Sequence, residues 1–263
     1  MTTRKQITNI LTIAVVAITF LLVSGAASAA TISVTASAPA SAYDLTTVNG
    51  VGDWAYWDND LAGAAPLNSK IGASLIGDLS VVGAGELRST TSADSTAYSF
   101  TFTDGTSSTE TSPRSGPIGM FHTVLDLVGK GVQLDVVSPT ADAYTIYLWS
   151  AVFQGKSTLK ATIGATNDSA QSGLAGSARV STLYTIEVDP DTVGETVNLQ
   201  LTLSYDGAGT SAHTSLGGIA VDTASATVLE EIVWYSSATT NITMNSAWAK
   251  STVDTDLTGI VLV

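Results

Sequence analysis

Alternation of apolar and polar residues with a period of two is the main pattern along this chain, and it predicts short β-strands. The clearest case is residues 98–103, in which aromatic side chains alternate with hydroxyl side chains. The turn-forming pair Asp104-Gly105 follows directly. Beyond the N-terminal segment, no stretch longer than about ten residues has the 3.6-residue apolar period of an amphipathic helix. The pattern therefore predicts an all-β protein.

The same alternation predicts strands along most of the chain. Residues 144–149 are almost continuously large, so we expect this strand to be buried on both faces. In residues 197–205, the four apolar side chains from Val197 to Leu203 lie on one face. The other predicted strands are 31–37, 70–79, 118–128, 132–137, 158–163, 183–188 and 216–221.

Turn residues predict how some of these strands connect. Gly129-Lys130-Gly131 predicts a hairpin between residues 118–128 and 132–137, and residues 183–188 are expected to pair with 197–205. Polar, Gly-rich and Ser/Thr-rich stretches predict loops. These stretches are 89–96, 106–117 and 167–178, and residues 81–85 form a predicted turn.

Roughly nine to eleven short strands at even spacing are typical of an antiparallel β-sandwich, jelly-roll-like in its connections. A closed barrel is the alternative. We assign residues 30–226 to this sandwich domain and residues 227–263 to a C-terminal extension. The extension is interpreted as additional strands. The alternative is a tail that pairs with a neighbouring protomer, because an apolar terminal strand can add to a sheet edge.

Residues 1–29 have the features of a cleaved signal peptide. Arg4 and Lys5 precede the apolar run 10–23, and Ala27-Ser28-Ala29 offers the small residues of a cleavage site. The run has about 14 residues, whereas a membrane-spanning helix needs roughly 20; a retained anchor is the alternative. The mature chain is then predicted to have no transmembrane segment and to be secreted or in the cell envelope, extracellular or periplasmic.

The charge balance limits the partners that this chain can bind. Without the leader, eight basic residues stand against 23 acidic ones, a balance of −15. Such an acidic surface disfavours nucleic acid and anionic membranes, which require clustered Lys and Arg. It suits neutral ligands or divalent cations. The sequence has no cysteine, so no disulfide can support the fold.

Trp54, Tyr56 and Trp57 form the densest aromatic group, and they are the candidate ligand-binding residues. A flat aromatic ring matches the apolar face of a sugar, so these rings could form a stacking platform. The alternative is that they fill the core. In a strand, Trp54 and Trp57 would lie on opposite faces, so the three rings could not share one platform.

Asp58, Asn59 and Asp60 follow this aromatic group and offer the oxygen ligands that calcium prefers. A structural calcium site is therefore a hypothesis, which Asp53, Asp104 and Asp222 could complete in space. The spacing matches neither an EF-hand loop nor an RTX repeat, and a solvated acidic turn is the alternative.

Catalytic patterns are missing from the sequence. The chain has no Gly-x-Ser-x-Gly motif, and its two histidines, His122 and His213, match no zinc pattern. A glycosidase needs two carboxylates across a cleft, and nothing in the sequence pairs any of the single acidic residues. The sequence predicts a protein that is not an enzyme.

Four motifs stand out along the chain: Gly52-Asp53-Trp54-Ala55-Tyr56-Trp57, Asn68-Ser69-Lys70-Ile71-Gly72, Phe100-Thr101-Phe102-Thr103-Asp104-Gly105-Thr106 and Gly217-Gly218-Ile219-Ala220-Val221. With these motifs the chain resembles secreted bacterial jelly-roll modules of cell-surface and polysaccharide-associated proteins. The resemblance covers roughly residues 34–226. Tyr56 and Phe102 stand where such modules commonly have His and Trp. The resemblance implies a noncatalytic β-sandwich, sometimes linked to carbohydrate recognition.

Two functions remain open at this point. The first is a module that binds polysaccharide or a cell-surface glycan. The second is a structural or adhesive cell-surface protein that self-associates through its C-terminal strands. A conspicuous exposed aromatic side chain would favour the first function, and an unpaired C-terminal strand would favour the second.

Overall fold

The computed structural model describes residues 29–57, 65–66, 68–83, 86–89, 95–106, 110–115, 118–121, 128–206 and 212–223. In this part of the chain, the regular elements are all β-strands, which confirms the all-β prediction. Strand pairs are antiparallel except β2 with β7. The predicted signal peptide, apart from Ala29, and the predicted C-terminal extension lie outside the described residues.

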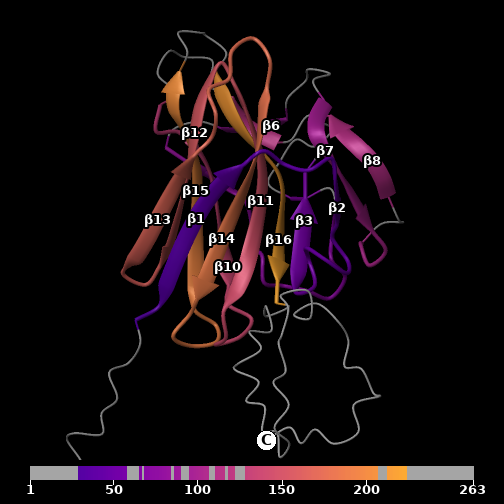
Figure 1. Cartoon of the computed structure of the whole chain (residues 1–263), viewed down its shortest axis with the longest axis vertical. Helices are drawn as coiled ribbons and strands as arrows, with labels where there is room; N and C mark the ends of the chain where they lie inside the picture. The colour runs from indigo at the N-terminus through magenta and orange to yellow at the C-terminus, as the bar shows by residue number, and fades with distance from the viewer. Residues whose placement is uncertain are drawn as a thin grey trace, which may run out of the picture. The chain divides into compact units, whose positions relative to one another are not determined.

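The strands form three sheets (Figure 1). The largest runs β1 (Thr31–Ser37), β14 (Val180–Asp189), β11 (Tyr144–Phe153), β16 (His213–Asp222), β3 (Asp53–Tyr56) and β4 (Asn68–Ser69), with β9 (Ile118–Phe121) on β16 and β6 (Glu86–Ser89) on β9. The second runs β13 (Thr166–Gln171), β12 (Gly155–Ile163), β15 (Thr196–Asp206), β10 (Gly131–Val137) and β5 (Ser80–Val82). The third runs β2 (Ala42–Asp44), β7 (Ser95–Phe102) and β8 (Glu110–Ser115).

The two larger sheets bury a common apolar core between them. Along β12, Leu159, Ala161 and Ile163 are buried, whereas Lys160 and Thr162 point outward, as their alternation predicts. β10 and β14 alternate in the same way, whereas β16 and the second half of β11 are buried on both faces. The facing side chains include Ile146, Leu148, Tyr184, Ile186, Ile219 and Val221 from the eight-stranded sheet and Val132, Leu134, Val136, Val197, Leu199 and Leu201 from the five-stranded sheet.

The other face of the eight-stranded sheet is also covered, at β3, β11 and β16. Figure 1 shows β2 and β7 beside β3. Trp54 and Tyr56 point toward this third sheet, whereas Ala55 and Trp57 point into the main core. This confirms that Trp54 and Trp57 lie on opposite faces. The side chains on the third-sheet side form what we call the aromatic layer: Leu45, Trp54, Tyr56, Tyr98, Phe100, Phe102, Trp149 and Ala220, with Tyr43, Tyr147 and Leu183 at its margin.

Ring contacts hold the aromatic layer together. Phe100 meets Trp149 edge-on, with ring centroids 5.0 Å apart, and Phe102 lies 4.7 Å from Trp54. Such tilted and edge-to-face pairs contribute about 0.5–1.5 kcal/mol each beyond the burial of their area. The strict alternation of residues 98–103 places Tyr98, Phe100 and Phe102 on the same side of β7, so the third sheet contributes three rings from one strand.

One open side of the sandwich is closed by a carboxylate. β1 and β13 are the edge strands of the two larger sheets, and the Val34 N–H donates to Asp168 Oδ2 at 2.8 Å. The Thr166 hydroxyl donates to the Ala30 carbonyl at 2.9 Å. A charged side chain that occupies an edge amide protects the edge from pairing with another chain.

The predicted hairpin across Gly129-Lys130-Gly131 is wrong. β10 pairs with β15 and β5, while β9 pairs with β16 and β6 in the other larger sheet. Residues 183–188 and 197–205 are strands as predicted, but β14 and β15 also lie in different sheets. Consecutive strands cross between the two sheets here, and the apolar pattern cannot tell this from a hairpin, because each strand turns one apolar face toward the core in either arrangement.

Four predictions of strands, turns and loops also differ from the structure. Residues 70–79 contain only isolated bridges at Lys70 and Ile76, and β5, which begins at Ser80, includes Val81 and Val82 of the predicted turn. The predicted loops 106–117 and 167–178 contain β8 and β13. β13 alternates between half-buried and exposed side chains that are nearly all polar, so its sequence has no apolar face to identify it as a strand.

Gly218 tests how tightly the aromatic layer covers β16. A Cβ at this position would lie 2.9 Å from Phe100 Cζ, and the Phe100 ring is held against Trp149. We expect Gly218→Ala to lower the free energy of unfolding by about 1–3 kcal/mol, as overpacking does. Urea unfolding measures this change. Gly176→Ala is the matched control because open space surrounds that position, and its effect should stay within about 0.5 kcal/mol. Equal effects of the two substitutions would contradict the tight packing.

Candidate functional site

The three aromatic residues proposed as a ligand platform lie in the interior. Trp54 is 0 % exposed, Tyr56 1 % and Trp57 2 %. Trp54 and Tyr56 belong to the aromatic layer, and Trp57 belongs to the main core. No ring face remains for a sugar, so the platform prediction is wrong for these residues, and the alternative that they fill the core is what the structure has.

Polar groups at the end of β3 form a network around one carboxylate. Asp104 Oδ1 accepts hydrogen bonds from Trp54 Nε1 at 3.0 Å and from the Thr46 hydroxyl at 2.8 Å. Asp104 Oδ2 lies 2.9 Å from Lys70 Nζ. Lys70 Nζ also donates to the carbonyl of Gly50 at 3.1 Å. One acidic side chain thus connects residues from three separate stretches of sequence.

Backbone contacts join the motifs that carry the resemblance. Ile71 N–H donates to the Asp104 carbonyl at 2.8 Å, and Thr106 N–H donates to Ser69 at 2.9 Å. Gly105 lies where any side chain would collide, since its Cβ would fall 2.7 Å from Asn68 Oδ1 and 2.9 Å from the Trp54 ring. The motifs therefore meet in space, and their contacts there hold the third sheet and its loops against β3.

The two buried or half-buried aspartates of these motifs respond oppositely to their surroundings. Burial alone would raise the pKa of Asp104, but the hydrogen bonds from Lys70, Thr46 and Trp54 together with the Lys70 charge lower it below 3.8. Burial raises the pKa of Asp53, and three backbone N–H donors only partly oppose that effect. Both carboxylates are occupied by groups of the protein itself.

The proposed calcium ligands Asp58, Asn59 and Asp60 lie outside the described residues. Within the described part of the chain, no three His, Cys, Asp or Glu side chains gather closely enough to hold a metal ion. Asp53 and Asp104, which could have completed such a site, accept hydrogen bonds from Leu75, Trp54 and their neighbours instead. A calcium site at residues 58–60 stays a prediction.

The outward side of the five-stranded sheet is a continuous polar surface, which we call the outer face. Its side chains form cross-strand rows that follow the strand register. Carboxamides and hydroxyls prevail, and each can both donate and accept hydrogen bonds. The rows are Ser80, Gln133, Gln200, Lys160 and Ser169; then Asp135, Asn198, Thr162 and Asn167; and then Thr202, Thr158 and Gln171.

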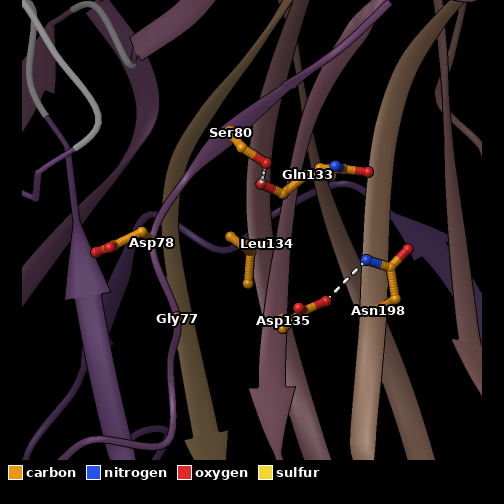
Figure 2. Close-up of a pocket in the computed structure, with 7 residues that line it drawn as sticks. All are labelled: Gly77, Asp78, Ser80, Gln133, Leu134, Asp135 and Asn198. Carbon is orange, nitrogen blue, oxygen red and sulfur yellow. Dashed lines mark hydrogen bonds between the residues drawn. The ribbon is translucent and has the colours of Figure 1, made fainter.

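A small hollow of about 90 Å³ lies at the β5 side of the outer face. Figure 2 shows Asn198 Nδ2 donating to Asp135 Oδ1, at 2.8 Å, and the Asp78 carboxylate pointing away from this pair. The Ser80 hydroxyl donates to the Gln133 carbonyl at 3.4 Å. The hollow offers donors and acceptors to a ligand but no aromatic surface.

A larger hollow of about 360 Å³ lies at the other end of the outer face, where β15 ends. Lys156, Gln171, Leu174, Ser204 and Tyr205 line it. Tyr205 is 51 % exposed and Leu174 58 % exposed. Tyr205 is the aromatic residue among the exposed large hydrophobic side chains of the described part of the chain. The volume of this larger hollow falls in the range of small-ligand sites, and its walls combine apolar and polar groups.

A β-bulge directs Tyr205 to the outer face. Val197, Leu199, Leu201 and Leu203 all point inward, so strict alternation would place Tyr205 inward as well. The register shifts between Lys156 and Ser157, so that Tyr205 pairs with Lys156 and Leu203 with Ser157. Bulges change the direction of a side chain in this way. The period-two alternation of residues 197–205 would place Tyr205 in the core, so the sequence alone does not identify it as an exposed residue.

The comparisons with known proteins identify no family. No family model and no curated protein matches the chain. A solved structure from Clostridium perfringens, of CBM51-2 in complex with GlcNAc and INT domains of ZmpB, matches with a TM-score of 0.29 and 8% identity. The match covers 54% of this chain and 29% of that chain. A likeness this distant supports no statement about function.

No helix long and apolar enough for a membrane span occurs in the described ranges.

His213, one of the two histidines considered for catalysis, is buried beside Phe153, with ring centroids 5.5 Å apart. The other, His122, lies outside the described residues.

The Asp104 network predicts a pH dependence of stability. Because the pKa of Asp104 is lower in the folded protein than in the unfolded chain, its ionised form stabilises the fold above pH 3.8, and this contribution is lost as the pH falls through the lowered pKa. We expect Asp104→Asn to reduce the free energy of unfolding by about 1–3 kcal/mol at pH 7, as expected for hydrogen bonds to a charged group. The gap to the unmutated protein should narrow as the pH approaches 3.

Urea unfolding between pH 7 and pH 3 measures both effects. Asp142→Asn is the control, because Asp142 is exposed and its side chain contacts only Thr140. Its effect should stay within about 0.5 kcal/mol at every pH. A gap for Asp104→Asn that does not change with pH would contradict the role of the charge.

Proposed function

We propose that this protein is a secreted, noncatalytic β-sandwich module that binds carbohydrate along its outer face, with Tyr205 as the stacking platform. The observation that carries the proposal is the exposed Tyr205 ring beside Leu174, at the end of a polar sheet surface. Tyr205 replaces Trp54, Tyr56 and Trp57, which are buried, as the proposed ligand-binding residue.

The chemistry of the outer face suits a sugar chain. A sugar ring has an apolar face, which an exposed tyrosine can cover with little loss of side-chain entropy, since it has two rotatable angles. Sugar hydroxyls both donate and accept hydrogen bonds, as do the Gln133, Gln200 and Asn198 carboxamides. Asn198 and Tyr205 are seven residues apart, about 20 Å along β15. An oligosaccharide fits such a length better than a single sugar.

The strand order supports a jelly-roll topology, which we propose as the finer description of the fold. In the eight-stranded sheet the order is β3-β16-β11-β14, and in the five-stranded sheet it is β10-β15-β12-β13. From β10 to β12 and from β13 to β16, each strand lies in the sheet opposite to the one before it. This arrangement is what two Greek keys folded into facing sheets produce.

The sequence features of an exported protein support the proposed secretion. The N-terminal segment has the order of charged, apolar and small residues that a signal peptide has, and the acidic balance suits a soluble extracellular protein. Assembly through residues 227–263 is the alternative function. Those residues lie outside the described part, so no observation there favours it.

Tyr205→Ala tests the proposal. We expect the full chain to bind at least one polysaccharide on a glycan array, and Tyr205→Ala to weaken that binding at least tenfold because the stacking ring is lost. The fold should stay intact, because Tyr205 is 51 % exposed and belongs to none of the buried core clusters. Tyr205→Phe should keep most of the affinity because it retains the ring.

The control is Val193→Ala, another exposed apolar residue, which lies outside both hollows. It should leave binding unchanged. Urea unfolding of each variant separates a loss of binding from a loss of folding. If the folded, unmutated chain bound no glycan on the array, the proposal would be contradicted and the structural or adhesive function would be favoured.

A further inference from the structure

We propose that the ligand of the outer face is an anionic glycan, whose carboxylate or sulfate groups bind Lys156 and Lys160 while a ring stacks on Tyr205. The inference rests on the proposed function and names the ligand class for the same site.

The two lysines and the tyrosine lie together on the outer face. Lys156 lines the larger hollow and is the cross-strand partner of Tyr205. Lys160 follows four residues later on the same side of β12 and pairs with Gln200. At roughly 3.3 Å per residue, the two lysines are about 13 Å apart along the strand. A glycan that crosses the platform therefore passes both ammonium groups.

Among the side chains that the structure describes, which do not include that of Asp206, no ion pair involves Lys156 or Lys160. The ion pair found there joins Lys70 to Asp104, at the far end of β3. The charges of Lys156 and Lys160 are thus available to a ligand.

The net charge of −13 does not prevent an anion from binding here. At physiological ionic strength, exposed charges act over about 8 Å, so local groups dominate. Asp135, an acidic residue of the outer face, pairs with Asn198, about 20 Å along β15 from Tyr205. Among the described side chains of the outer face, the charged ones near Tyr205 are Lys156 and Lys160, whereas Asp78 and Asp135 line the smaller hollow. An anionic sugar unit is therefore favoured at the Tyr205 end.

A neutral glycan would behave differently. It would use Tyr205, Gln171 and Ser204, and it would leave the lysine ammonium groups hydrated. Its affinity would then be indifferent to the charge at positions 156 and 160. Sensitivity to that charge separates the two ligand classes without changing the platform.

Calorimetric titration of the full chain with matched probes tests the inference. Hexagalacturonate carries carboxylates, and its methyl ester is the neutral match; dextran sulfate and dextran form the corresponding sulfate pair. We expect the anionic member of at least one pair to bind at least tenfold more tightly than its neutral match. Raising the salt from 0.05 to 0.5 M should weaken that binding several-fold, because exposed charges are screened.

Substitution locates the charges. We expect the double variant Lys156→Gln, Lys160→Gln to weaken binding of the anionic probe about tenfold and to leave the fold intact, each lysine contributing roughly threefold. Lys130→Gln is the control, since it removes the same charge from a side chain that packs beside Gly83 and does not line the larger hollow. It should change the affinity less than twofold.

The outcomes distinguish the two proposals. If charged and neutral probes bind equally, or if the double variant binds as tightly as the unmutated chain, the anionic ligand class is wrong while carbohydrate binding at Tyr205 stands. If no probe and no polysaccharide on the array binds, the proposed function fails and this inference fails with it. Preference for the carboxylate pair or for the sulfate pair identifies the anionic group.

Discussion

Burial of the eight-stranded sheet on both faces is the constraint on which the rest of this structure depends. Strands β3, β11 and β16 carry apolar side chains on both sides, and nearly every residue of β16 is buried. A sheet of this kind needs two covering layers. The five-stranded sheet supplies one of them, and the aromatic side of β7 supplies the other. The third sheet is therefore a required cover for Trp54, Tyr56 and Trp149, whose exposure would cost several kcal/mol in lost burial.

The polar network around Asp104 holds this cover in place. Apolar contacts alone would fix the position of the third sheet against the eight-stranded sheet only weakly, because burial has little directional preference. Asp104 accepts a hydrogen bond from Trp54 of the eight-stranded sheet and forms an ion pair with Lys70 of the adjoining loop. These contacts fix the position of the third sheet relative to the eight-stranded sheet. Hydrogen bonds to a carboxylate are about twice as strong as neutral ones. The most conspicuous motifs of the sequence thus serve the assembly of the fold, which explains why they do not identify a ligand.

Residues with one clear role could be predicted from the sequence, and residues with a role set by distant contacts could not. The alternation in residues 31–37 and 158–163 was enough to locate β1 and the inward side chains of β12, since each strand has one apolar face. β13 and β8 carry almost no apolar pattern and are recognised only by their pairing partners. The sequence also could not separate a buried tryptophan from an exposed one, because an aromatic ring suits both a core and a sugar platform. Trp57 and Tyr205 illustrate this: the first is enclosed by the facing sheet, and the second is exposed by a bulge.

That bulge connects the fold to the candidate site. Val197, Leu199, Leu201 and Leu203 point inward at every second position of β15, so strict alternation would turn position 205 inward as well. Tyr205 can reach the outer face only through a break in that alternation. The extra residue, Ser204, provides the break, and its hydroxyl donates to the Lys156 carbonyl across the pair. Tyr205 is thereby placed next to Lys156 on a strand anchored by the core, so the ring and the charge share one rigid support. Sites built on strands hold their geometry more precisely than sites on loops. The core that fixes β15 therefore also sets the spacing between the Tyr205 ring and the Lys156 and Lys160 side chains, which the proposed glycan would contact.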